Sequence, residues 1–253
     1  YQIITIKILL FWRFIVIIKH GTRKLEDKMK NKAFTLAEVL ITLGIIGIVA
    51  SMTLPALIQN NKDKEVEAKL KKVYSVMNQA ILMSEIDNGP KEYWDFFDAS
   101  FFDTYFAPYL KEVRVKKFQS FGGKNRAIYF SDGSLLVTKS SYDYFFFPNA
   151  KNFDEETFAH TSENGSLMGR KDCGITYFAF GFAPTLNDTE HKYHYKKGFE
   201  PYKFRLSELS KEELMHSGDD YSCNKNSSIK DWCTALIQLN NWKIPKDYPF
   251  KVK

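Results

Sequence analysis

The longest uncharged apolar run in the chain extends from Val39 to Ile58, twenty residues in all. A short basic stretch, Lys30–Ala33, precedes it, and one acidic residue, Glu38, stands at its start. As a helix with about 1.5 Å of rise per residue, Phe34–Ile58 would be about 37 Å long, enough to cross a hydrocarbon core of about 30 Å. The pattern therefore predicts a membrane-spanning helix.

Beyond this run, apolar residues recur every three or four positions from Asn60 to Glu85, which predicts an amphipathic helix that continues the span. Its buried face should hold Val66, Leu70, Val73, Met77, Ala80 or Ile81, and Ser84. Asn88-Gly89-Pro90 should end the helix. Asp95–Val113, with aromatic residues at helical spacing, predicts a second helix whose aromatic face lies in the core.

From Ala127 the apolar period changes to two, which is typical of strands. The predicted strands are Ala127–Ser131, Leu135–Lys139, Tyr144–Phe147, Gly174–Phe182 and, more weakly, Phe204–Leu206. Asp132-Gly133 between the first two suits a type I′ hairpin turn. Ser207–Met215 predicts a short helix capped by Ser207. We therefore expect an α+β fold, with a long N-terminal helix, half membrane and half amphipathic, packed on an antiparallel β-sheet domain.

Glu38 is the unusual residue of the apolar run. A carboxylate in a membrane helix costs about 2.5 to 3.5 kcal/mol and calls for a partner. The run itself contains no basic residue that could supply one. A basic partner for Glu38 would therefore come from outside the run.

The segment Phe34-Thr-Leu-Ala-Glu38 after a short basic leader resembles the signal of the type IV pilin and type II secretion pseudopilin family. The resemblance implies that prepilin peptidase cuts between Ala33 and Phe34 and methylates the new amine of Phe34. It further implies that Glu38 meets that amine in a neighbouring subunit. The family usually has Gly before the cut, and we expect the small Ala33 to be processed as well.

The resemblance extends into the helix. Pro55 matches a family proline and, with Gly44 and Gly47, makes the segment bendable. Ala37, Gly44 and Ser51 recur every seven residues and form a groove of small side chains, with Gly47 beside them, where another helix could approach. One alternative is an ordinary membrane anchor. Another is a secretory signal peptide that is cut near Ala50 or Ser51.

The resemblance implies a subunit of a type II secretion pseudopilus or type IV pilus-like filament, with no reaction of its own. Its partners would be other pilin-like subunits, the prepilin peptidase, the inner-membrane assembly platform and the membrane. It would cross the bacterial inner membrane once, with the N-terminus cytoplasmic and the C-terminal domain periplasmic or extracellular. The region Gly218–Pro249 also resembles, more loosely, the C-terminal region of pilin-like secretion proteins. The alternative function is a membrane-anchored extracytoplasmic enzyme or binding domain.

The formal net charge of +6 lies in residues 1–33, which contain eight Lys or Arg and two acids. The remainder balances 28 cations with 28 acids, so overall charge gives no reason to expect a nucleic-acid partner. Basic residues that flank a membrane helix stay cytoplasmic, which places the N-terminal side inside.

The first methionine is Met29, so the leader is expected at 29–33, the assembly helix at 34–58 and the globular domain at 59–253. Residues 1–28 then represent translated upstream sequence. The alternative is a real first membrane segment, although Lys7 and Arg13 interrupt its apolar run.

Candidate sites for chemistry are sparse. Cys223 and Cys233 could form a disulfide in an oxidising exterior and leave Cys173 over, although three thiols remain the alternative. The spacing in Glu190–His194 could place two histidine ligands on one helical face, but with no clear third ligand we expect a solvated loop. Asp219 and Asp220 are weak calcium candidates, far short of six to eight oxygen ligands. We found no convincing catalytic constellation and expect no cofactor.

Overall fold

The computed structural model describes residues 35–111, 113–118, 125–139, 142–155, 158, 172–206, 209–216 and 218–253. The chain divides into two compact units, with the boundary between Leu54 and Pro55. The predicted upstream sequence, 1–28, and the predicted leader, 29–33, lie outside the described residues.

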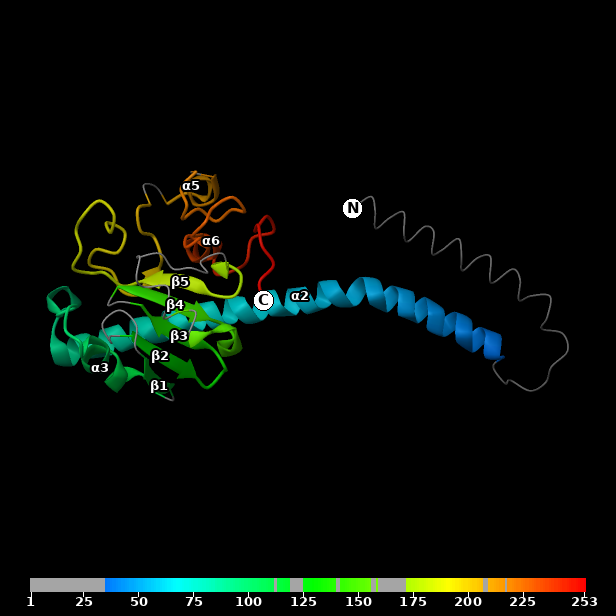
Figure 1. Cartoon of the computed structure of the whole chain (residues 1–253), viewed down its shortest axis with the longest axis horizontal. Helices are drawn as coiled ribbons and strands as arrows, with labels where there is room; N and C mark the ends of the chain where they lie inside the picture. Colours follow the sequence, from blue (N-terminus) through cyan, green and yellow to red (C-terminus); the bar gives the residue numbers. More distant parts are fainter. Residues whose placement is uncertain are drawn as a thin grey trace. The chain divides into compact units, whose positions relative to one another are not determined.

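Helix α2, Leu36–Asn88, contains the whole apolar run and the amphipathic segment in 53 residues (Figure 1). By length and composition it can cross a membrane, and none of its most apolar window is buried. The hydroxyls of Thr42, Ser51 and Thr53 donate to carbonyl oxygens three or four residues earlier in the helix. These polar side chains are thereby satisfied inside the helix, as a lipid environment requires.

In the second unit, α2 presents the predicted apolar face to the core. Its buried residues are Val66, Leu70, Val73, Met77, Ala80, Ile81 and Ser84, which confirms the sequence pattern. Gly89, with φ of 75°, and Pro90 follow the last helical turn. Glycine accepts this left-handed conformation without strain, so the predicted end of the helix is also confirmed.

A six-stranded antiparallel sheet with strands in sequence order forms the centre of the second unit. Its strands are β1 (Val113–Phe118), β2 (Asn125–Phe130), β3 (Leu135–Thr138), β4 (Asp143–Phe147), β5 (Phe178–Gly181) and β6 (Glu200–Pro201). The long helix and the antiparallel sheet confirm the α+β expectation. Strands β1 and β6 were not predicted.

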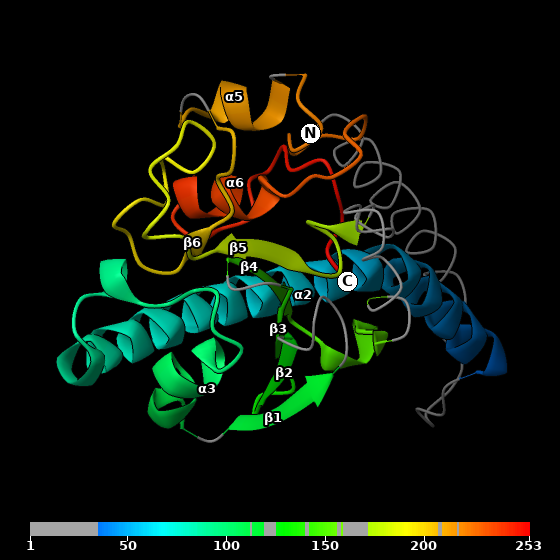
Figure 2. The same cartoon turned by 60° about the vertical axis from the view of Figure 1, so that its left-hand side comes forward.

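Both faces of the sheet are buried at its central strands, which explains why β3 and β4 are apolar except at Thr138 and Asp143. Ile128, Leu136, Phe146 and Phe178 form one cross-strand row, in the cluster that contains the buried face of α2. The alternate residues, among them Val137 and Phe145, belong to the cluster with α5 (Lys211–His216) and α6 (Cys233–Leu239). Figure 2 shows α6 and α5 across the sheet from α2.

The predicted helix at Asp95–Val113 is wrong in extent, because only α3, Phe101–Tyr105, is α-helical there. The side chains of Asp95 and Asp98 accept hydrogen bonds from backbone N–H groups two residues later, at 2.9 and 2.8 Å. Such local bonds compete with helix formation. The short 3₁₀ helix η2 (Lys91–Tyr93) precedes the segment and η3 (Ala107–Tyr109) lies within it, where Pro108 at the start of η3 interrupts α-helical bonding.

The β2–β3 turn is not the type I′ turn that the sequence predicted. Type I′ needs positive φ at both central residues, but within this turn only Gly133, with φ of 78°, has it. Gly133 N–H donates to Phe130 O and Phe130 N–H to Ser134 O, as in a three-residue loop with a glycine bulge. Asp132 Oδ1 accepts from Ser134 N–H, which stabilises this alternative.

Three further predictions need correction. The strand predicted at Gly174–Phe182 begins only at Phe178, because Gly174, with φ of 76°, is part of a turn. Phe204–Leu206 is not a strand, since Arg205 has φ of 59° and lies in a turn. Helix α5 begins at Lys211, and the hydroxyl of Ser210 accepts from Glu213 N–H, whereas Ser207 lies outside the described residues. Helix α6 was not predicted.

Candidate functional site

The start of α2 contains a reciprocal set of hydrogen bonds between Thr35 and Glu38. The backbone N–H and the hydroxyl of Thr35 each donate to Glu38 Oε2 at 2.9 Å. In return, the N–H of Glu38 donates to the Thr35 hydroxyl oxygen at 3.2 Å. This is a capping box, which satisfies backbone donors that a helix N-terminus leaves without partners.

The capping box gives Glu38 partners within its own chain, which sequence reasoning missed. The signal was present, because Thr followed three residues later by Glu before an apolar run is the sequence pattern of this motif. The carboxylate also lies at the N-terminal end of the helix, where the helix dipole favours negative charge. Glu38 therefore has a defined position at the head of the apolar helix.

The predicted cleavage position between Ala33 and Phe34 lies outside the described residues. Sequence adjacency still places the amine that cleavage would create one residue before Thr35. Because Thr35 already contacts Glu38, the carboxylate lies in the part of the chain where that positive charge would appear.

The small residues of the run leave space along α2. An added Cβ at Gly44 or Gly47 would meet nothing within 4 Å. The neighbouring Leu40, Leu43 and Ile48 are about half exposed or more, at 61, 59 and 59%. Pro55 lies inside the helix and cannot donate a backbone hydrogen bond to the carbonyl of Ser51. An exposed apolar surface of this length marks a membrane or partner contact.

The C-terminal region contains a disulfide between Cys223 and Cys233, and both residues are fully buried. Cys173 is also buried, in the same hydrophobic cluster. The disulfide joins the 219–227 turns to the first residue of α6. It is a cross-link suited to an oxidising compartment.

The two histidines of Glu190–His194 point to different partners. His191 Nδ1 contacts Asp188 Oδ1 at 2.8 Å. His194 is 2% exposed, and its Nε2 accepts from Lys203 N–H at 3.0 Å, so the expectation of a solvated loop is wrong for His194. Within the described residues, no group of three or more metal-binding side chains exists.

The calcium candidates do not form a cage of oxygen ligands. The carboxylate of Asp219 accepts from Tyr221 N–H at 2.9 Å, and its carbonyl accepts from Ser222 N–H and the Ser227 hydroxyl. The carbonyl of Asp220 accepts from Ile229 and Lys230 N–H. These bonds organise turns and give no positive support for a calcium site.

Comparison with known proteins divides the chain near the boundary between its two units. Residues 28–54 match the prokaryotic N-terminal methylation motif, and residues 56–252 match a family of unknown function, DUF6613. No curated protein and no solved structure matches the chain. The methylation motif confirms the type IV pilin-like signal around Phe34 and Glu38. The chain belongs to the DUF6613 family and carries at its N-terminus the methylation signal of type IV pilin-like proteins.

Proposed function

We propose that this protein is a pilin-like structural subunit that is cut between Ala33 and Phe34 and assembled through α2 into a pseudopilus or pilus-like filament. The observation that carries the proposal is the Thr35–Glu38 capping box at the head of an exposed apolar helix, inside a methylation motif. A prepilin peptidase would make the cut and methylate the new amine.

The geometry of Glu38 suits a contact between subunits. Within the described residues, Oε2 accepts both bonds from Thr35 and Oε1 accepts none. Oε1 would therefore be available to the methylated amine of Phe34 on a neighbouring subunit. In lipid, each charge would lose hydration, and pairing would satisfy both. Such a pair sets the axial register of a filament more than its stability.

The rest of the helix would serve the same assembly. Gly44 and Gly47 would let a neighbouring helix approach closely, and Pro55 would let α2 bend as subunits pack. The N-terminal side would be cytoplasmic, as the type IV pilin-like signal implies. The second unit, with its disulfide, would then lie in the oxidising exterior.

The test is the Glu38→Ala variant. It should insert into the membrane and be cut like the natural chain, but should not assemble, which crosslinking of cells that carry the assembly platform would measure. Glu65→Ala is the matched control, because Glu65 is an acidic residue of the same helix whose side chain is 61% exposed beside Lys69. It should assemble normally.

A second variant separates helix capping from pairing between subunits. Thr35→Ala removes the capping box but keeps the carboxylate, so it should still assemble. Normal assembly of Glu38→Ala would contradict the proposal and favour a simple anchor on an exported domain. Equal loss in Thr35→Ala and Glu38→Ala would assign Glu38 to capping alone.

A further inference from the structure

Four exposed lysines lie close in sequence to Gln59, where α2 leaves its apolar run, or to Val252, whose carbonyl contacts Gln59. Lys62 and Lys64 lie on the helix itself, four and six residues beyond Ile58. Lys251 and Lys253 lie at the end of the described chain. We call these four residues the basic collar. All belong to the second unit.

The C-terminal part of the collar is fixed against the helix by its backbone. Gln59 Nε2 donates to the carbonyl of Val252 at 3.2 Å. The N–H of Lys253 donates to Ile175 O at 2.9 Å. Val252 is 1% exposed and belongs to the main hydrophobic core. Lys251 and Lys253 therefore extend from an ordered backbone held at Gln59, the first residue after the apolar run.

The acidic residues nearby are already engaged. Asp63 accepts from Gln59 at 2.8 Å, Glu65 pairs with Lys69 at 2.7 Å, and Glu67 accepts from Ile244 N–H at 2.8 Å. By contrast, across the part of the chain that the structure describes, no ion pair involves a lysine of the collar. Among the described residues, the ammonium groups of the collar are thus not held in ion pairs.

The position of the collar along the helix matches the depth of lipid headgroups. With about 1.5 Å of rise per residue, Lys62 and Lys64 lie about 6 and 9 Å beyond Ile58. The headgroup layer on each side of a hydrocarbon core is about 5 to 8 Å thick. With Ile58 at the edge of the hydrocarbon, the collar ammonium groups therefore reach the phosphate groups, which attract basic segments next to a membrane.

We propose that the basic collar binds the headgroups of anionic phospholipids and holds the base of the second unit on the membrane surface. The inference rests on the membrane anchor of the proposed function, but not on cleavage or filament assembly. Phosphate oxygens accept hydrogen bonds from several ammonium groups at once, and a zwitterionic headgroup would partly cancel that attraction.

The test uses the full-length chain in vesicles of phosphatidylcholine and phosphatidylglycerol, followed by native mass spectrometry of the lipids that remain bound. The natural chain should retain phosphatidylglycerol about fivefold or more above its share of the vesicle lipid, and added salt should weaken this preference. In a variant with Lys62, Lys251 and Lys253 all changed to Gln, the preference should fall close to the vesicle composition.

The matched control changes Lys192, Lys196 and Lys197 to Gln. It removes the same charge from exposed residues of the loop that Figure 1 shows, in yellow, at the other end of the second unit from the C-terminus. This control should keep the preference. An equal preference in all three proteins, or equal loss in the control, would overturn the inference. Flotation with the vesicles distinguishes failure of this inference from failure of the proposed function. A chain that does not float would contradict the membrane anchor itself, whereas a chain that floats without lipid preference would contradict only the role of the collar.

Discussion

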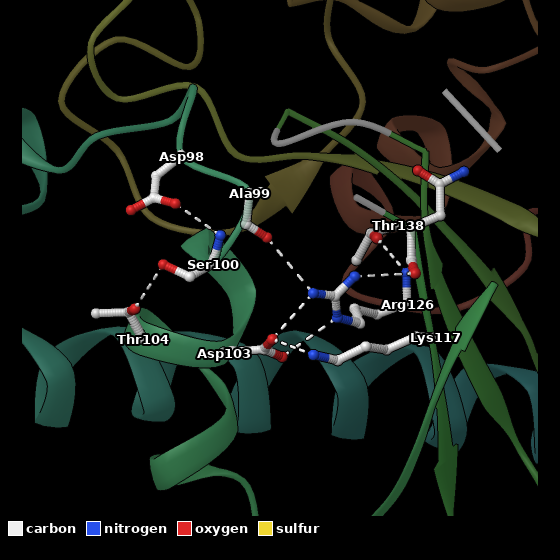
Figure 3. Close-up of polar contacts among 9 residues, drawn as sticks. Asp98, Ala99, Ser100, Asp103, Thr104, Lys117, Arg126 and Thr138 are labelled. Carbon is white, nitrogen blue, oxygen red and sulfur yellow. Dashed lines mark hydrogen bonds and ion pairs between the residues drawn. The ribbon is translucent and has the colours of Figure 1, made fainter. Parts of the chain in front are cut away.

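The carboxylate of Asp103 binds one edge of the buried guanidinium of Arg126 through two parallel hydrogen bonds (Figure 3). Nε of Arg126 donates to Oδ1 at 3.2 Å and Nη2 donates to Oδ2 at 2.9 Å. The Arg126 side chain is only 3% exposed, and its backbone N–H donates to the Thr138 hydroxyl. The pair thus joins α3 to strands β2 and β3.

Asp103→Asn should lower the free energy of unfolding by about 2 to 4 kcal/mol, because it leaves a buried guanidinium without its counter-charge. Urea unfolding of the purified chain in detergent, followed by tryptophan fluorescence, would measure the change. Lys117→Gln is the control, since Lys117 pairs with the same carboxylate at 2.8 Å but is 68% exposed. It should cost no more than about 1 kcal/mol. Equal losses in the two variants would refute a special role for the buried pair.

His194 should make stability depend on pH. Burial, with smaller contributions from the charges of Lys203, His191 and Lys197, lowers the pKa of His194 to about 3. Between this value and the unfolded value of about 6.5, the unfolded chain binds a proton that the folded chain does not. The free energy of unfolding should therefore fall as pH falls through this window, by up to about 1.4 kcal/mol per pH unit.

His194→Gln should be less stable at pH 7, because the ring packs against Gly181 and accepts from Lys203 N–H. However, this variant should lose the part of the pH slope that begins near pH 6.5. His216→Gln, which changes an exposed histidine, should keep that slope. Urea midpoints between pH 7 and pH 5 would decide, and an unchanged slope in His194→Gln would show that the buried ring does not titrate as described.

Reduction of the disulfide should destabilise the second unit. Cys223 and Cys233 are 10 residues apart. A disulfide that closes a loop of this size lowers the entropy of the unfolded chain and so raises the free energy of unfolding by about 2 to 3 kcal/mol. Cys223→Ser with Cys233→Ser should therefore unfold at a lower temperature and be insensitive to dithiothreitol. The natural chain and Cys173→Ala should both lose stability when the reductant is added. If dithiothreitol also destabilised the double variant, the reductant would act at a site other than the Cys223–Cys233 disulfide, which would contradict this prediction.

Structure was predicted most accurately from the sequence where a single apolar periodicity and a single buried face determine the element. The buried face of α2 follows from apolar spacing alone, because the helix packs on the sheet with a single stripe. The Thr35–Glu38 capping box, which the sequence analysis missed, could have been predicted in the same way, since it depends on two residue types at fixed spacing. The small residues around Gly44 and the apolar run around them were likewise visible without a structure.

Other features depend on tertiary context that a local pattern does not contain. Strand β1 alternates apolar residues with Arg114 and Lys116, and its half-buried valines become meaningful only once β2 pairs with it. The segment after Asp95 has helical spacing, but the Asp side chains and Pro108 favour turns. His194 lies in a polar stretch and is buried only because Gly181 leaves room for its ring.

The central claim is that the functional chain begins at Phe34 and presents its amine to Glu38 of a neighbouring subunit. Intact mass and N-terminal analysis of the protein purified from cells that contain a prepilin peptidase would test it most directly. The account predicts a mature chain that begins with Phe34 and carries one methyl group on its amine. A chain that keeps Lys30–Ala33, or one that begins near Ser51, would contradict it.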